Sequence, residues 1–590
     1  MDKKSLAAIA LCVVLILAWN PLLRQLGLLP APEPPASGPA AAATPAEPPP
    51  LTTAASQATA TAAAPAAVAL EPAPTATGAA ATGTPAFANL AVPGFYQAHI
   101  DLRTGALAEV ELEQYPNDAR TAAMTLGHAG RAAGEIRLAG QPLAGQGPAV
   151  VVEQAAQRLV LERPLADGLV LRQEWAAVPD RPYQLAYTVR FRNTGTVPLE
   201  LKPMTVLAGL MELPAAQAKG GWGAPADLAA SVAFAGESRA KLYNPKGIGK
   251  AKAEERRELA GRRTAWAAAH TKYFLVAMAG EAPAAGAELE TGSAAGGEPD
   301  AGEIQFVAAN LLLPPATVAA GGELAQRFTV YAGPKELARL RALGNGLDSV
   351  LQMDLFFFFH PQWMGSVSRL ILGGMLWVQR QIGAPWAYGV AIILITVLVK
   401  FLFWPLTHYS TISMKKMQGL QPLMAGLKEK YKDSPQLMQQ KIMELYREHK
   451  VNPLGGCLPI LLQIPVFFAL FNVFRGAIEL RQAPFLWVAD LSQPDTLPFL
   501  AHLLPIRPLA ILTGVTMFLQ QKLTPSSMDP AQAKMMSFMT LFFAFIFYGM
   551  PAGLTLYWTV NQGLSIVQTL ITFRLVRHLV PPHPGAERPA

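Results

Sequence analysis

The sequence has few charged residues for its length: only 15% of its 590 residues are charged, whereas 51% are hydrophobic. A soluble protein usually carries about a quarter charged residues. This scarcity excludes a plain soluble globular protein and predicts long apolar segments. The formal net charge of +7 arises mainly from residues 361–590, the most hydrophobic part, while residues 30–360 are acidic overall. Such a distribution favours basic loops beside membrane spans over a nucleic-acid surface.

Cysteine and catalytic motifs are also scarce. Cys12 and Cys457 are the only cysteines, and both lie in apolar stretches, which excludes a disulfide framework. His99, His128 and His270 are scattered without the spacing of metal ligands, and the sequence has no zinc-protease, serine-hydrolase or phosphate-loop motif. We therefore expect no metal, no cofactor and no enzymatic activity.

The first 86 residues predict an anchor followed by a tether. Lys3 and Lys4 precede an apolar run without a good cleavage site, so residues 1–29 are predicted to be an uncleaved transmembrane anchor that starts in the cytoplasm. A cleaved signal peptide has a similar beginning. Residues 30–86 are mostly Ala, Pro and Thr, and we expect a disordered linker because they offer little apolar surface to bury.

Residues 87–351 predict a large all-β domain outside the cytoplasm. Short segments in this region alternate apolar and polar residues and end at Gly, Pro or Asn. The clearest alternation places one face of a strand at Tyr183, Leu185, Tyr187, Val189 and Phe191. The number of such segments favours a sandwich of antiparallel sheets.

The remaining residues predict a helical membrane domain. Residues 352–385 contain an amphipathic helix, Trp363–Ile382, that either lies along the membrane interface or packs within the protein. Residues 386–580 are predicted to form five spans, and residues 581–590 a cytoplasmic tail. The last apolar stretch, Met535–Phe573, is too long for one span and divides at Gly549–Gly553. With the anchor this gives six spans and places both termini in the cytoplasm.

The basic loop 407–456 is predicted to be a cytoplasmic helical hairpin. Its apolar stripes include four methionines, a residue type that adapts to varied apolar partners. Two alternatives remain open: the stripes pack against each other, or they contact client proteins or the ribosome. The candidate contact residues are Met414, Met417, Met424 and Met438.

Lys400 is the strongest functional candidate. It lies about two-thirds of the way along the second predicted span, where an ammonium group costs about 2.5–3.5 kcal/mol to insert. No acidic residue lies inside any predicted span, so Lys400 has no carboxylate partner there. A hydrated, positively charged cavity open to the cytoplasm would reduce the cost, and snorkelling to the cytoplasmic surface is the alternative.

Four motifs, in this order, resemble the YidC-type membrane protein insertases of the Oxa/Alb/YidC superfamily. The motifs are Ile392–Leu406 with the following Thr407, Lys450–Cys457, Glu479–Phe485 and Pro551–Tyr557. Six spans with an external β domain are similar to the form of this family found in bacteria with two membranes.

The resemblance implies a function that composition does not provide. It implies an inner-membrane insertase and chaperone for newly made membrane proteins, which acts alone or with the Sec translocon. The ribosome, the signal recognition particle pathway and membrane lipids are further implied partners, and no nucleotide cofactor is implied. The family's external domain is a β supersandwich that lies in the periplasm.

The resemblance also implies a hydrophilic groove for the client protein. Lys400 stands where the family usually carries Arg, and Thr396 and Gln463 are expected to line the groove. Tyr557 and Trp558 match an aromatic pair that meets the client, with Trp558 in place of the usual Tyr. The exchange of Arg for Lys keeps the charge but loses bidentate binding of carboxylates.

Two other classes of function remain open. A channel or small-molecule transporter would also use polar residues within spans. A membrane-tethered carbohydrate-binding or envelope scaffold protein would use the external β domain.

Overall fold

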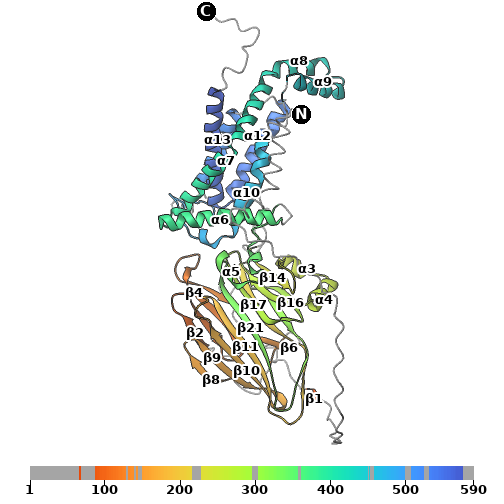
Figure 1. Cartoon of the computed structure of the whole chain (residues 1–590), viewed down its shortest axis with the longest axis vertical. Helices are drawn as coiled ribbons and strands as arrows, with labels where there is room; N and C mark the ends of the chain where they lie inside the picture. Colours follow the sequence, from red (N-terminus) through yellow and green to blue (C-terminus); the bar gives the residue numbers. More distant parts are fainter. Residues whose placement is uncertain are drawn as a thin grey trace, which may run out of the picture. The chain divides into compact units, whose positions relative to one another are not determined.

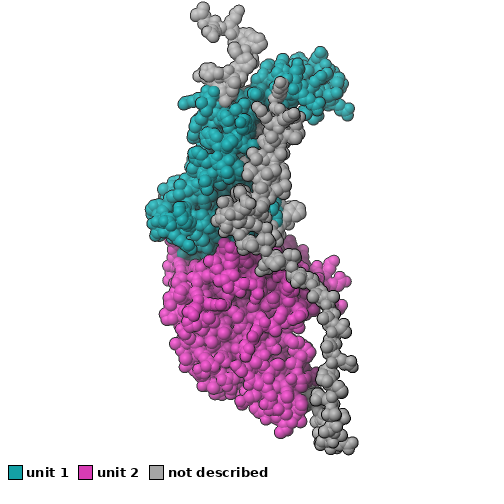
Figure 2. Space-filling view, viewed as in Figure 1, with its two compact units in different colours: residues 1–45, 352–590 teal, residues 46–351 magenta. Residues whose placement is uncertain are grey.

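The computed structural model describes residues 66–67, 87–127, 131–138, 141–143, 149–214, 227–295, 303–356, 361–449, 451, 458–497, 506–523 and 530–575. The predicted anchor 1–29, the tail 581–590, Cys12, Cys457 and His128 lie outside the described residues. The chain divides into two compact units, one of residues 46–351 and one of residues 1–45 with 352–590 (Figure 2).

The β-rich unit is built around one nine-stranded antiparallel sheet. In sheet order its strands are β15 (Lys241–Tyr243), β14 (Ala229–Phe234), β16 (Thr264–His270), β17 (Phe274–Ala284), β21 (Glu323–Pro334), β11 (Gln184–Asn193), β10 (Leu169–Ala177), β9 (Arg158–Pro164) and β8 (Val150–Ala155). The predicted apolar face from Tyr183 to Phe191 is buried, which confirms the alternation. Tyr187 in this face stacks on Trp175 at 4.0 Å between ring centroids.

A five-stranded sheet packs against the large one. Its order is β18 (Gly286–Ala295), β19 (Glu303–Leu313), β13 (Met204–Pro214), β6 (Ile136–Leu138) and β7 (Gln141–Pro142). β13 and β19 contact β16 and β17 across the two sheets. The approach is close at Gly209, where an added Cβ would lie 2.3 Å from the Val276 carbonyl oxygen, so only glycine fits. This face-to-face packing of sheets forms the core of the unit.

Two smaller sheets and short helices complete this unit (Figure 1). The four-stranded sheet has the order β2 (Phe87–Val92), β3 (Tyr96–Asp101), β4 (Ala106–Pro116) and β5 (Ala123–Gly127). The three-stranded sheet has the order β1 (Ala66–Ala67), β12 (Leu199–Leu201) and β20 (Ala316–Val318). The helices are η1 (Ala166–Gly168), α3 (Pro245–Lys250), α4 (Ala253–Gly261), α5 (Leu337–Leu343) and η2 (Leu347–Leu351).

β1 lies within residues 30–86, which the composition predicted to be a disordered linker. Ala66 and Ala67 form a short strand there because their backbone pairs in parallel with Leu199 and Glu200 of β12. This pairing uses only the backbone of the two alanines, whereas composition describes side chains. Composition therefore does not predict a strand at this point of the expected linker.

The second unit is helical. Its helices are α6 (Gln362–Ile382), α7 (Ala387–Gly419), α8 (Gln421–Lys430), α9 (Pro435–Glu448), α10 (Leu458–Gly476), α11 (Pro508–Leu523), α12 (Pro530–Tyr548) and α13 (Ala552–Leu575), with a short η4 (Ile478–Leu480). The long apolar stretch divides between α12 and α13, as predicted. α6 crosses one end of the bundle formed by α7, α10, α12 and α13, and the α8–α9 hairpin lies at the other end (Figure 1).

α6 confirms the predicted helix and shows what its two faces do. Gly383 ends the helix in the left-handed conformation (φ 70°), which glycine adopts without strain. The face with Met364, Leu372 and Met375 is buried, and α6 contacts α7 and α10. Trp377 lies on the exposed face. The helix therefore packs within its unit by one face, and its place at a membrane interface stays a prediction.

The described helices differ in whether they are long and apolar enough to span a membrane. Ala387–Met417, within α7, is the one described segment long and apolar enough to cross a membrane by length and composition, and Ser537–Tyr548 is a shorter apolar helix. α13 is the central element of the bundle because it contacts α7, α10 and α11. The predicted count of six spans stays a prediction.

Candidate functional site

Lys400 lies in the contact between α7 and α13. Its Nζ donates a hydrogen bond to Ser565 Oγ at 2.6 Å, and Ser565 Oγ donates to the Asn561 carbonyl oxygen at 2.9 Å. The ammonium is partly buried, and in the described part of the chain no carboxylate pairs with it. The structure therefore holds this positive charge against a neutral hydroxyl group between two helices.

The Lys400–Ser565 contact is one of a row of polar contacts between α7 and α13. Residues 561, 565, 568 and 572 of α13 recur at the spacing of one helix face. The contacts with α7, besides Lys400 with Ser565, include Gln568 with Thr407, His408 Nδ1 with Thr572 Oγ1 at 3.1 Å, and Lys415 Nζ with the Phe573 carbonyl oxygen at 3.3 Å. We call these residues the polar seam. It runs along α7 from Lys400 to Lys415.

The predicted aromatic pair lies on α13 beside α10. Gln463 of α10 donates a hydrogen bond to the Tyr557 hydroxyl, and Tyr557 is fully buried. The Trp558 ring lies 5.6 Å from that of Phe467 on α10 and 5.0 Å from that of Phe547 on α12. Gln463, Tyr557 and Trp558 are thus brought together where α10, α12 and α13 meet.

Thr396 and Lys400 lie one turn apart on α7. Thr396 is buried, and its hydroxyl donates to the Ile392 carbonyl oxygen of its own helix at 2.6 Å. Among the described residues, no hydrogen bond or ion pair joins Lys400 to Gln463 or Tyr557. The predicted groove residues therefore fall into two groups, one at the α7–α13 contact and one at the α10–α13 contact, and the groove stays a prediction.

Two polar atoms on α13 near this site have no hydrogen-bond partner in the described part of the chain. They are Trp558 Nε1 and Asn561 Oδ1, and both are buried. With Ser565 they recur at i, i+3 and i+7, which places them along one face of α13. Buried polar groups normally have a partner. This face therefore carries one donor and one acceptor that are left without a partner among the described residues of the helical unit.

Two of the four candidate methionines of the cytoplasmic hairpin belong to its own core. Met424 of α8 is buried with Leu420, Tyr446 and Val451, and Met417 packs against this cluster. The Tyr446 hydroxyl lies 3.2 Å from Met424 Sδ. Met414 and Met438 are partly buried, while Leu423, Leu437 and Met443 are exposed. The structure thus favours the self-packed alternative for Met417 and Met424.

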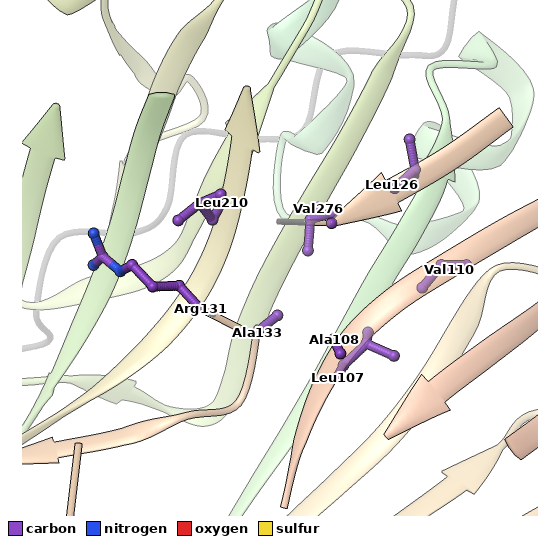
Figure 3. Close-up of a pocket in the computed structure, with 9 residues that line it drawn as sticks. Leu107, Ala108, Val110, Leu126, Arg131, Ala133, Leu210 and Val276 are labelled. Carbon is purple, nitrogen blue, oxygen red and sulfur yellow. The ribbon is translucent and has the colours of Figure 1, made fainter. Parts of the chain in front are cut away.

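The β-rich unit contains a small, mostly apolar pocket (Figure 3). Its lining consists of Leu107, Ala108, Val110, Leu126, Gly127, Arg131, Ala133, Leu210 and Val276. Arg131 is the one charged residue of that lining, and its guanidinium, which points away from the apolar side chains, pairs with Glu290 at 2.9 Å. A carbohydrate needs several polar groups directed at its hydroxyls, and this lining does not provide them.

His270, which the sequence placed among the scattered histidines, lies in a buried row of three side chains. Its Nε2 is 2.9 Å from Ser231 Oγ, and its Nδ1 is 2.9 Å from Lys335 Nζ. All three side chains are buried, and their polar atoms pair with one another inside the unit.

Comparisons with known proteins relate both units to one family. The family model described as 60Kd inner membrane protein matches residues 377–578, and that of the YidC periplasmic domain matches residues 94–360. Among curated proteins, the membrane protein insertase YidC of Pelobacter propionicus is 44% identical over 315 residues, which are 53% of this chain and 54% of that protein. The YidC of Geobacter sp. is 38% identical over 343 residues, 57% of this chain and 59% of that protein.

The aligned part of the chain spans about half the length of these curated relatives. A solved structure, an active YidC insertase with the first transmembrane domain resolved, is similar at 20% identity. The similarity covers 82% of this chain and 94% of that chain with a TM-score of 0.33.

Proposed function

We propose that this chain, which belongs to the YidC family of inner-membrane proteins with a periplasmic domain, inserts newly made proteins into the membrane and helps them fold. The observation that carries the proposal is Lys400. It is a cation in the one described helix that is long and apolar enough to cross a membrane, held against Ser565 between α7 and α13 without a carboxylate partner in the described residues. A cation at such a depth is a functional candidate by default.

The mechanism follows from this charge and from the polar face of α13. Lys400 attracts the polar, often acidic, end of an incoming segment. Trp558 Nε1 and Asn561 Oδ1 hydrogen-bond to water or to that polar end during part of its crossing. The apolar part of the segment meanwhile moves past α10 and α12 into the lipid. Partitioning of apolar surface then drives insertion, so the mechanism includes no nucleotide and no chemical step.

The proposal includes a topology of six spans. The spans are residues 1–29 and the apolar parts of α7, α10, α11, α12 and α13, with both termini in the cytoplasm and residues 87–351 in the periplasm as a β supersandwich. The charge pattern supports it, because the loop that contains α8 and α9 is rich in Lys whereas residues 475–507 carry equal numbers of acidic and basic residues.

The proposed partners follow from the same arrangement. Nascent membrane proteins are the clients. The ribosome and the signal recognition particle pathway would meet the hairpin α8–α9, and the Sec translocon would deliver clients from within the membrane. The exposed apolar residues of the hairpin, Leu423, Leu437 and Met443, are available for such contacts, in addition to the partly buried Met414 and Met438.

The test is insertion of a small inner-membrane substrate into liposomes that contain the purified chain. Lys400→Glu is expected to lower insertion about tenfold or more, the change that ~1.4 kcal/mol produces, because it repels acidic ends. Lys400→Arg keeps the charge and should stay active. Lys416→Glu, at an exposed position of the same helix, is the matched control and should remain near wild type.

Equal insertion by wild type and by Lys400→Glu would contradict the role of the charge. Flux of small solutes through the same liposomes would instead favour a channel or transporter. Crosslinks from ribosome-bound nascent chains to residues near 400, 463 and 557 would support the proposed path directly.

A further inference from the structure

A tight turn projects from the segment between α10 and α11. Phe485 and Val488 close it with two backbone hydrogen bonds, N to O at 2.9 Å and 2.8 Å. The two residues at its tip are hydrophobic and exposed: Leu486 is 73% exposed and Trp487 is 44% exposed. The tip of this turn is therefore both apolar and exposed.

The backbone of the turn makes the leucine more unusual. Leu486 has a φ of 53°, in the left-handed region that favours glycine and disfavours a branched side chain. A glycine at this position would remove both the backbone strain and the exposed apolar surface. Because strained positions tend to mark functional sites, the turn suggests that a leucine side chain is needed at the tip.

The base of the turn is fixed to the bundle. The Phe485 ring lies on the first turn of α7, where a Cβ added at Gly389 would be 2.1 Å from it. Val488 and Leu491 are buried, and the Leu491 carbonyl oxygen accepts from Gly553 N in the first turn of α13 at 2.8 Å. The turn is thus held against the N-terminal turns of both α7 and α13.

Other exposed tryptophans lie at the same end of the bundle. Trp386, directly before α7, is 49% exposed, and Trp377 of α6, which crosses this end (Figure 1), is 64% exposed. The indole Nε1 of Trp487 is 3.5 Å from Asp495 Oδ2, so its polar edge is turned to the protein. Exposed tryptophans at the ends of apolar helices are typical of the boundary between lipid and water.

We propose that the turn of residues 485–488 is a lipid hook. Leu486 and Trp487 insert into the interface of the membrane leaflet on the side opposite the α8–α9 hairpin, where they hold the first turns of α7 and α13 at that depth. The occupant of this surface is phospholipid, because the apolar tip is fixed beside the beginnings of two apolar helices. The inference rests on the proposed membrane location of α7 and α13.

The experiment uses spin labels on single cysteines in the full chain, with Cys12 and Cys457 replaced by Ala, in vesicles of phosphatidylethanolamine and phosphatidylglycerol. Labels are placed by Leu486→Cys and, separately, by Trp487→Cys. Leu398→Cys, on the exposed apolar side of α7, is the lipid control, and Lys416→Cys, exposed near the end of α7, is the water control. Collision rates with oxygen and with a nickel chelate report lipid and water, respectively.

The ratio of oxygen to nickel collisions at position 486 is expected to exceed that at 416 at least threefold and to approach that at 398. A ratio at 486 equal to that at 416, with 398 lipid-like, would overturn the hook because the tip would then lie in water, while the insertase proposal would stand. Water-like ratios at both 486 and 398 would overturn the membrane location of α7 and the hook together.

Discussion

At the scale of the residue, the sequence predicts Lys400 but not its partner. A lysine within an apolar run is visible from the sequence alone, because its insertion cost does not depend on the neighbouring helices. Ser565 is one of several polar residues in the last apolar stretch, and its contact with Lys400 depends on how α7 and α13 pack. Ser565 was not among the residues singled out from the sequence, although the recurrence of residues 561, 565, 568 and 572 on one helix face is a sequence signal that could have indicated it.

The burial of some polar residues in the β-rich unit likewise depends on packing and cannot be read from the sequence. Glu135 is buried, and this burial raises the pKa of its carboxyl group despite the attraction of Arg137, whose Nε lies 3.3 Å away. No sequence pattern distinguishes Glu135 from the exposed glutamates of the same unit, because the surrounding side chains come from distant strands.

The raised pKa of Glu135 predicts a dependence of stability on pH. The folded state binds the proton more tightly than the unfolded state, so the contribution of Glu135 is most favourable at low pH and is lost as pH rises through the folded-state pKa. Glu135→Gln removes the ionisation, and Arg137 keeps its other partner, Glu290, at 3.1 Å. The unfolding temperature of the variant minus that of wild type should therefore rise from roughly pH 4 to pH 7.

Thermal unfolding of the full chain in detergent, followed through the β signal in circular dichroism, measures this difference. Glu254→Gln, at an exposed position of α4, is the control. A difference for Glu135→Gln that stays flat or falls with pH would contradict the prediction.

At the scale of the element, apolar periodicity predicted where the helices lie, but it did not predict what their apolar faces contact. α6, the hairpin helices and the break between α12 and α13 follow from apolar spacing and from Gly383, Pro435 and Pro551. The same spacing left two alternatives open for the hairpin, self-packing and contact with client proteins, because an apolar stripe has the same pattern in both cases. The contact between Met424 and Tyr446 favours packing within the hairpin for Met424, and client contact by the hairpin stays a prediction.

The packing of the hairpin predicts losses of stability of different size for two methionine substitutions. Met424→Ala removes a buried side chain from the small core of α8 and α9 and should cost about 2–3 kcal/mol of local stability. Met443→Ala changes a side chain that is 42% exposed and should cost less than about 0.5 kcal/mol. Hydrogen exchange of the α9 amides measures both. Unchanged exchange in Met424→Ala would mean that this residue is free to bind clients.

At the scale of the whole molecule, composition predicted a β-rich part and a helical part, and the structure contains both. Composition did not predict the pairing of β1 with β12 or the order of strands in the large sheet, because these depend on contacts between distant segments. The family resemblance, carried by motifs in residues 392–557, suggested the proposed function, which composition alone did not.

The division into two compact units predicts that insertion depends on one of them. Each unit has its own core, so a chain without residues 90–340 should still fold its helical unit and retain most insertion activity in liposomes. The full chain with Lys400→Glu is the comparison, and it should be the weaker of the two. Loss of insertion in the shortened chain, with its helices intact by circular dichroism, would assign the client path to the β-rich unit instead.

The length of α7 fixes the distance between Lys400 and the base of the α8–α9 hairpin. It runs as one helix through Pro405 from Ala387 to Gly419, where the hairpin begins. At 1.5 Å per residue, Gly419 lies about 28 Å along the helix axis from Lys400. An extended chain covers that distance with about eight or nine residues. In the proposed mechanism, a client held at the base of the hairpin would therefore need a segment of about this length to reach Lys400, so the length of α7 would set the shortest polar end that Lys400 can bind.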